Sequence, residues 1–303
     1  MPKLSLVIPT LNNALPLAIL LDSARRQTLP PDEIIVIDSS SDDDTAAIAG
    51  HRGARVIVIP RADFDHGGTR TAGGKAACGD IVLFMTDDAL PADTCCFEKL
   101  LLPFADPAVA AVYGRQLPAE NATPLASHLR HFNYPPKSCR RRWEDRARWG
   151  LKTAFLSNSF CAYRKNALAQ AGWFREDIII AEDMCAGLQL LKRGGTLCYN
   201  AEACVYHSHN LPVRREFSRY FDIGVMHALE KDVLAELGRA EGEGKRYALS
   251  ALSCLSVWRY PEFFARAAAK YAGYLLGKNC RLLPRGLILK LSLNPGWWRK
   301  YGT

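Results

Sequence analysis

The chain has 303 residues, 49% of them hydrophobic, so it can bury a large core in one domain or two. Its net charge of +8 favours phosphorylated substrates or anionic lipid as partners, and without a recognisable nucleic-acid-binding motif we expect no nucleic acid. No apolar run reaches the roughly 18 residues of a membrane span, and no signal peptide follows Met1. The ten cysteines form no Cys-x-x-Cys pair. Together these three features predict a cytoplasmic protein.

The first ninety residues alternate between strand and helix patterns. Short apolar runs predict buried strands at residues 4–8, 34–37, 56–59 and 81–85. Helical spacing predicts helices over residues 15–27 and 46–52, and Thr69 is the expected N-cap of a third helix within residues 67–77. This order predicts an α/β fold with a mostly parallel, doubly wound sheet flanked by helices.

The order of elements is less regular after Pro91. We expect helices at residues 97–104, 165–171 and 182–193, and strands at residues 109–114, 155–163 and 196–206. Residues 117–150 show no clear period, which predicts a long mobile loop that closes as a lid. The pattern is helical beyond Arg214, so we predict a catalytic domain over residues 1–212 and a helical region over residues 213–303.

Acidic side chains follow two of the predicted strands. Asp87 and Asp88 end the apolar run 81–85, at the edge where open α/β sheets bind ligands, and two carboxylates there can hold a divalent cation on a diphosphate. An ordinary acidic turn is the alternative. Asp38 ends the second strand, where its carboxylate can accept a hydrogen bond from a ribose hydroxyl or a base imide, or else cap the next helix.

Three further motifs carry candidate chemistry. The run from His66 to Arg70 contains two glycines that allow close backbone approach, and its arginine can pair with phosphate, although such turns are common. Glu182 and Asp183 begin a predicted helix, where acids are favoured electrostatically and where one of them can also act as a general base. His207 and His209 share one face of a strand and either complete a metal site with Asp88 or serve packing.

Taken together and in this order, these motifs resemble family 2 glycosyltransferases with the GT-A fold. The matching segments are residues 7–12, 27–28, 34–45, 79–80, 86–88, 182–183 and 207–209. Residues 64–70, 84–91 and 205–210 are more similar to bacterial rhamnosyltransferases in particular. Two positions depart from the family pattern: Thr86 replaces the first acid of its Asp-x-Asp motif, and Thr71 stands where asparagine is usual.

The resemblance implies a role for each matched position. Asp183 would be the catalytic base with Glu182 beside it, while Asp88, His207 and His209 would bind a divalent metal, either Mg or Mn. The residues implied in donor binding are Pro9, Thr10, Asn12, Asp38, Ser40, His66, Gly67, Arg70 and Asp87. The implied reaction inverts the anomeric centre.

The same resemblance implies the substrates. The donor would be a nucleoside-diphosphate sugar, dTDP-L-rhamnose in the first instance, and the acceptor a growing bacterial surface glycan linked to a lipid diphosphate. A UDP-hexose donor and a non-catalytic sugar-nucleotide-binding scaffold remain alternatives. A nucleotidyltransferase would need a Gly-rich basic loop after the first strand, which residues 9–12 lack.

The C-terminal tail mixes aromatic, apolar and basic residues. Trp258, Trp297 and Trp298, with their neighbouring arginines and lysines, suit a helix lying on anionic lipid at the inner face of the membrane. The alternative is a helical region that packs on the catalytic core or on another subunit of a homo-oligomer. Arg140–Arg142 is the other basic segment.

Overall fold

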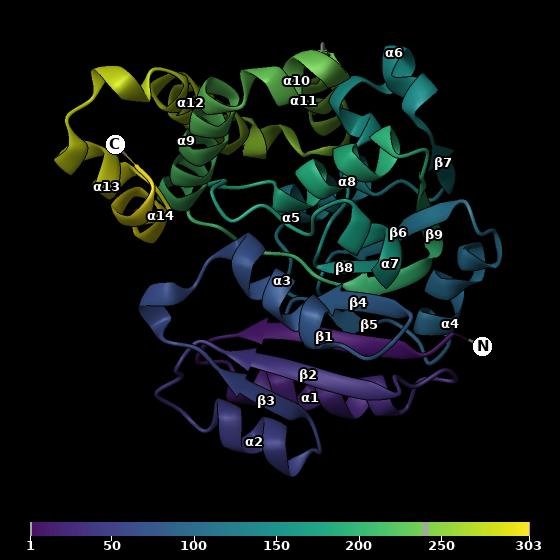
Figure 1. Ribbon diagram of the computed structural model, residues 1–303. Helices are drawn as coiled ribbons and strands as arrows, with labels where there is room; N and C mark the ends of the chain where they lie inside the picture. Colours follow the sequence, from purple (N-terminus) through teal and green to yellow (C-terminus); the bar gives the residue numbers. More distant parts are fainter. Residues whose placement is uncertain (1, 239–241, 303) are drawn as a thin grey trace.

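The computed structural model describes residues 2–238 and 242–302, and within them the strands form one nine-stranded sheet (Figure 1). Its order is β3-β2-β1-β4-β8-β6-β9-β5, and β7 pairs with β9. The strands are β1 (Leu4–Thr10), β2 (Glu33–Asp38), β3 (Arg55–Val58), β4 (Ile81–Met85), β5 (Leu90–Pro91), β6 (Val109–Leu117), β7 (Cys139–Arg141), β8 (Phe160–Arg164) and β9 (Thr196–Tyr206). The first four are parallel and β8 is antiparallel to both neighbours, so the predicted fold class is confirmed.

Both faces of the sheet are buried because side chains alternate along each strand. Leu6 and Ile8 point into one apolar cluster while Val7 points into the other. Helices α1 (Ala14–Arg25), α2 (Thr45–His51) and α4 (Cys96–Leu101) pack into the first cluster, and α7 (Lys165–Gln170) and α8 (Glu182–Lys192) into the second. The uninterrupted apolar strands are therefore explained by helices on both sides.

Helix α3 (His66–Ala76) begins earlier than predicted. Its N-cap is Asp65, whose carboxylate accepts a hydrogen bond from the Gly68 backbone N–H at 2.7 Å. Thr69, the expected cap, is buried inside the helix, so that prediction was wrong. An aspartate is as good a cap as threonine, and the two glycines that follow it did not prevent helix formation.

The predicted mobile loop over residues 117–150 is also wrong. This segment contains α5 (Pro124–Asn133), β7 and the short α6 (Arg146–Trp149). Thr123 caps α5 with its hydroxyl and Pro124 occupies the first turn, which is a start signal that the analysis overlooked. Arg141, in the basic run, is buried at 2% exposure and donates to the Phe155 carbonyl, so its charge does not contribute to a surface patch.

One predicted strand is shorter than expected. The apolar run from Phe155 suggested a strand over residues 155–163, but β8 starts only at Phe160. Residues 155–159 form irregular backbone and a turn instead, and this turn places Asn158 beside the start of α8.

The C-terminal helices gather beyond one side of the sheet (Figure 1). They are α9 (Val213–Leu229), α10 (Lys231–Leu237), α11 (Glu243–Cys254), α12 (Tyr260–Lys278), α13 (Arg285–Leu291) and α14 (Pro295–Lys300). Gly277 lets α12 lie directly on α9, since a Cβ there would sit 1.9 Å from the Phe221 carbonyl oxygen. The helical expectation for residues 239–241 lies outside the described residues.

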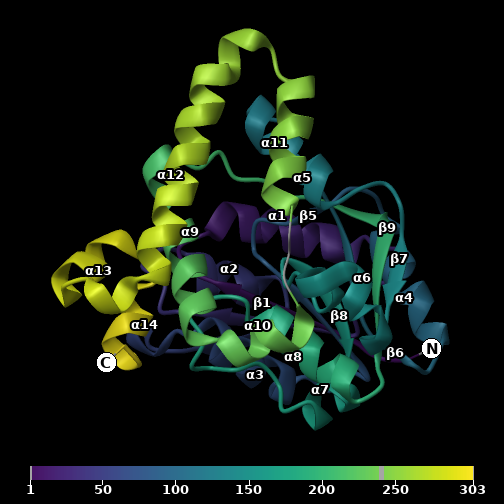
Figure 2. The ribbon, with the colours of Figure 1, turned by 90° about the horizontal axis from the view of Figure 1, so that it is seen from above.

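The tryptophans of the tail have different environments. Trp298 is buried in the core and Trp297 packs against it, so these two residues follow the alternative of packing on the catalytic core rather than lying on lipid. Trp258 is 89% exposed at the turn between α11 and α12, which project together from the molecule as a hairpin (Figure 2). No helix among the described residues is long and apolar enough to cross a bilayer.

Candidate active site

Two strained loops lie at the carboxyl edge of the sheet. Asn12 after β1 and Ser40 after β2 have positive φ angles of 50° and 56°. The Asn12 backbone N–H donates to Ser41 Oγ at 2.8 Å, and its side-chain oxygen accepts from the Asp42 N–H at 2.7 Å. Non-glycine residues held in this conformation concentrate at functional sites, and here they join the two loops into one rim.

The predicted donor-binding residues of this rim are already hydrogen-bonded. Asp38 is 1% exposed and accepts from both the backbone N–H and the hydroxyl of Ser41. The Ser40 hydroxyl donates to the Ile59 carbonyl at 2.7 Å. Thr10, which follows Pro9 in β1, donates to Asp87 Oδ2 at 2.7 Å and so ties β1 to the acidic turn after β4.

Asp88, His207 and His209 come together although they are far apart in the sequence. The Nε2 atoms of His207 and His209 lie 3.4 and 3.7 Å from the Asp88 carboxylate, and one ligand atom from each residue falls within 4.8 Å of the others. Burial opposes ionisation of Asp88, but the two imidazoles hold its pKa well below the usual range. This set of one carboxylate and two imidazoles fits a divalent transition-metal ion.

A buried glutamine defines which nitrogen of His207 carries the proton. Gln116 is 2% exposed, and its Oε1 accepts from Arg130 Nη1 at 2.5 Å while its Nε2 donates to Ser157 Oγ at 2.9 Å. An arginine can only donate, so the amide oxygen must face Arg130. The same oxygen lies 2.9 Å from His207 Nδ1, which must therefore be protonated.

With Nδ1 protonated, Nε2 of His207 faces an Asp88 oxygen at 3.4 Å. It can carry a second proton and donate it to the carboxylate, or it can keep its lone pair and share a cation with Asp88. The geometry therefore fits either an imidazolium–carboxylate pair or a bound cation. Neither Gln116 nor Arg130 was predicted from the sequence: the only signal of Gln116 is the polar pair Arg115–Gln116 at the end of the apolar strand β6, and Arg130 lies in the unpredicted helix α5.

The two acids at the start of α8 have different surroundings. Glu182 is buried and pairs with Arg70 at 3.0 Å, where both side chains are 9% exposed. Asp183 Oδ2 accepts from the Asn158 backbone N–H at 3.3 Å, and Oδ1 from the Met184 N–H at 2.8 Å. Burial and the charge of Glu182 raise the pKa of Asp183, so Asp183 is the better proton acceptor of the two.

Arg70, Gly67 and His66 lie on the first turns of α3. Arg70 is held by Glu182 rather than free to reach a phosphate, although its Nε has no partner among the described residues. Gly67 is needed for packing, since a Cβ there would sit 1.7 Å from the Arg175 carbonyl oxygen. Burial lowers the pKa of His66, and Asn294 of the C-terminal region lies near its ring.

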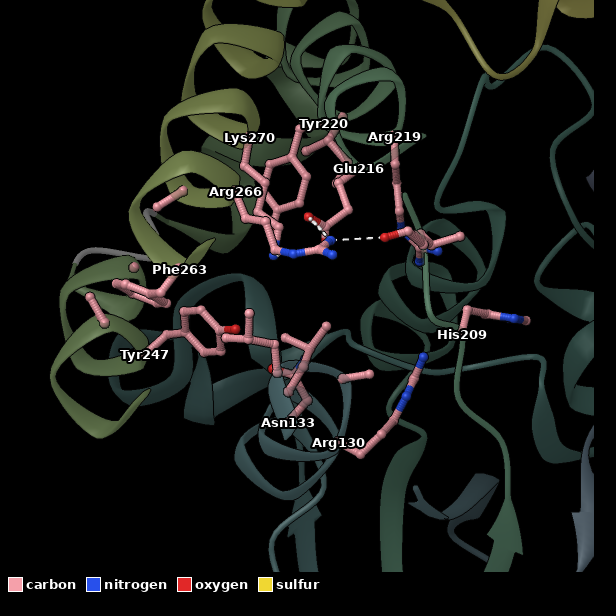
Figure 3. Close-up of a pocket in the computed structure, with 18 of the residues that line it drawn as sticks. Arg130, Asn133, His209, Glu216, Arg219, Tyr220, Tyr247, Phe263, Arg266 and Lys270 are labelled. Atoms are coloured by element: carbon pink, nitrogen blue, oxygen red, sulfur yellow. Dashed lines mark hydrogen bonds and ion pairs between the residues drawn. The ribbon is translucent and has the colours of Figure 1, made fainter. Parts of the chain in front are cut away.

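A large cavity adjoins the metal-binding candidates. It measures about 740 Å³ and lies between α5, α9, α11 and α12. Figure 3 shows His209, Arg130 and Arg219 at one side of this cavity, with Tyr247 and Phe263 at the other. Tyr134 also lines it. The cavity therefore adjoins the metal-binding candidates through His209, while Asp183 is not among its lining residues.

Comparison with known proteins identifies relatives of the whole chain. The sequence model of the family described as "Glycosyl transferase family 2" matches residues 5–172. The O-antigen chain rhamnosyltransferase RfbN of Salmonella typhimurium is 40% identical over 301 residues, which is 98% of this chain and 96% of that protein. WbaN of Salmonella anatum, also an O-antigen chain rhamnosyltransferase, is 40% identical over 303 residues, with the same two coverages of 98% and 96%.

Solved structures share the fold at low identity. The mannosyltransferase PcManGT from Pyrobaculum calidifontis, in complex with GDP-Man and Mn2+, superposes with a TM-score of 0.58 and 18% identity, covering 99% of this chain and 87% of that one. S. aureus TarS 1–349 in complex with UDP gives a TM-score of 0.53 and 14% identity, covering 92% and 91%. These similarities support the GT-A architecture.

Proposed function

The chain belongs to glycosyltransferase family 2, and we propose that it transfers L-rhamnose from dTDP-L-rhamnose to a hydroxyl of a bacterial surface glycan. The observation that carries this proposal is the convergence of Asp88, His207 and His209 into one cluster that adjoins a large cavity through His209. The choice of rhamnose rests on the whole-length identity to two rhamnosyltransferases.

Asp183 is the base in the proposed reaction. Its carboxylate keeps lone pairs free beside the two backbone N–H donors, and its raised pKa suits it to accept the proton of the attacking hydroxyl. Glu182 stays ionised through Arg70 and contributes negative charge that makes Asp183 more basic. Attack from the side opposite the leaving diphosphate inverts the anomeric centre.

Asp88, His207 and His209 hold the divalent cation in this proposal. Two nitrogen ligands favour Mn2+ over Mg2+, because imidazole suits transition metals and Mg2+ prefers oxygen. When bound, the cation neutralises the charge that develops on the leaving diphosphate. Gln116 keeps His207 in the tautomer whose Nε2 can coordinate.

The donor nucleotide is proposed to lie along the rim formed by the loops after β1 and β2. Thr10, Asn12 and Ser40 line this rim, and the Asp38 carboxylate would exchange a bond to Ser41 for one to the base or ribose. The start of α3, with His66 and Gly67, is the remaining part of the proposed donor site.

A donor screen tests the proposed function. Hydrolysis and thermal shift are measured with dTDP-L-rhamnose, UDP-glucose and GDP-mannose, each with Mn2+, with Mg2+ and with chelator. We expect a metal-dependent response to dTDP-rhamnose above the other donors and an inverted anomer in the product. A response to UDP-glucose alone would reject rhamnose but retain the transferase.

The acceptor is proposed to be linked to a lipid diphosphate, and the protein to touch the inner face of the membrane. The α11–α12 hairpin carries the supporting features: Trp258 and Val257 at its tip are 89% and 61% exposed, and Arg259 lies beside them. An exposed tryptophan with an adjacent cation suits the interface of an anionic bilayer.

A further inference from the structure

The cavity between α5, α9, α11 and α12 adjoins the metal cluster only at His209, and the proposed donor site assigns no ligand to the rest of it. We propose that it is the subsite for the sugar rings of the acceptor glycan, an inference that rests on the proposed transferase function. Its volume of about 740 Å³ falls within the range of about 300–1,000 Å³ for ligand pockets.

Aromatic side chains form much of its wall. Tyr220, Tyr247 and Tyr271 line it from three helices, and Tyr271 remains 65% exposed. The C–H bonds on one face of a sugar ring carry partial positive charge, which is attracted to the negative face of an aromatic ring. Rigid aromatic rings that remain solvent-accessible are therefore suited to stacking against sugars.

Fixed polar groups alternate with these rings. Glu216 accepts from Arg266 at 3.0 Å and lies 3.3 Å from Lys270, and Arg266 also donates to the Leu211 carbonyl at 2.8 Å (Figure 3). These contacts hold charged groups on the wall in defined positions, where sugar hydroxyls can bond to them. A lipid tail in the same place would strip water from these groups without replacing their hydrogen bonds, which is unfavourable.

The position of the cavity sets the direction of the glycan. His209 belongs both to its lining and to the metal-binding candidates, so the sugar that accepts rhamnose lies at this end. Arg130 and Arg219 stand here as well, and neither has a carboxylate partner within ion-pair distance among residues 2–238 and 242–302. The opposite end is framed by Tyr247 and Phe263 of the hairpin, so the glycan runs from the reaction centre towards the hairpin.

The chain offers a matched pair of variants for a test. Ala267 of α12 lines the cavity, and its neighbour Ala268 is exposed on the same helix without lining it. Ala267→Trp fills the cavity, and Ala268→Trp adds the same side chain outside it. The probes are farnesyl diphosphate alone and farnesyl diphosphate linked to mono- and disaccharides of glucose, mannose or galactose, titrated into the dTDP-loaded protein.

We expect at least one glycan-bearing probe to bind more tightly than farnesyl diphosphate, both to the natural protein and to Ala268→Trp. The affinity of this probe for Ala267→Trp should be lower by about tenfold or more. Tyr271→Ala should weaken it several-fold, and Tyr271→Phe, which keeps the ring, should restore it. Equal binding to Ala267→Trp, no advantage of the sugars over farnesyl diphosphate, or no binding of any probe overturns the assignment.

Donor binding separates this inference from the proposed function. The Ala267→Trp variant should bind dTDP-rhamnose with the same affinity as the natural protein does. If the natural protein itself ignores dTDP-rhamnose, the proposed function fails. If it uses dTDP-rhamnose and transfers rhamnose equally well in Ala267→Trp, only the subsite fails.

Discussion

Gln116 offers the sharpest test of how the metal-binding cluster is organised. Gln116→Met keeps the length of the side chain but removes the acceptor for His207 Nδ1 and for Arg130. His207 can then adopt either tautomer and turn about its side-chain bonds. Gln116→Glu keeps the acceptor and makes it negative, so it should raise the basicity of His207 Nε2.

The expected size follows from the loss of these two contacts, at 2.9 and 2.5 Å. Loss of a partner that orients a metal-binding histidine typically weakens metal affinity by about 10–100-fold, or about 1.4–2.7 kcal/mol. We expect Gln116→Met to fall in this range for Mn2+ and Gln116→Glu to bind at least as tightly as the natural protein.

Free Mn2+ is measured by electron paramagnetic resonance in the presence of dTDP, with urea unfolding as the check on stability. Gln27→Met is the matched control, because Gln27 is a 5%-exposed glutamine whose amide bonds to the Asp93 carbonyl and the Phe97 N–H instead. Unchanged Mn2+ affinity in Gln116→Met, or an equal loss in Gln27→Met, would refute the tautomer argument.

Four further outcomes follow from the site and the tail. Asp183→Asn should lower kcat by about 10²–10⁴ with unchanged dTDP affinity, and a retained kcat would exclude this residue as the base. Because burial and Glu182 raise the pKa of Asp183, kcat/KM should fall as the pH decreases through that raised pKa. Arg70→Met removes a cation that lowers the pKa of Asp183, so the acidic limb of the pH profile should move to higher pH. If this limb does not move, it reports the titration of another group. Arg70→Met should also cost about 3–5 kcal/mol in urea unfolding, because it leaves the Glu182 carboxylate buried without its partner, and adding Glu182→Gln should recover part of the loss. Trp258→Ser should reduce co-sedimentation with phosphatidylglycerol vesicles several-fold. The control Leu102→Ser, which removes a 63%-exposed apolar side chain elsewhere, should leave co-sedimentation unchanged. Equal effects of the two substitutions would argue against a role for the hairpin tip.

The strand ends could be predicted because their signal is local. An apolar run that stops at an acid reports both the buried strand and the edge where the acid lies, which located Asp38 and Asp88 correctly on the sheet. Gln116 could not be found in this way. Its partners His207 and Arg130 are 91 and 14 residues away, and a single polar residue in a strand looks the same whether it faces water or a buried imidazole.

Helix α5 shows a second limit of local reasoning. Its apolar side is narrow and its other residues are polar or basic, so the composition of residues 117–150 indicated a loop. Leu125 is buried only because α11 and α12, more than a hundred residues later, supply Ala251 and Phe263 against it. The start of α5 is signalled locally by Thr123 and Pro124, but the burial of its apolar side depends on tertiary packing, which the segment itself does not reveal.

The division into a catalytic domain and a helical region at residue 212 stays a prediction, and the contacts argue that both parts build one site. Asp222 of α9 is fully buried, and its carboxylate accepts from the Ser292 hydroxyl at 2.6 Å and from the Asn294 amide at 3.0 Å. Asn294 in turn lies near His66 at the start of α3. Because α9 also carries Arg219 into the cavity, a shift of the helical region would change both the wall of the cavity and the contacts at the start of α3. The helical region is therefore better regarded as the second half of the cleft than as an appendage to it.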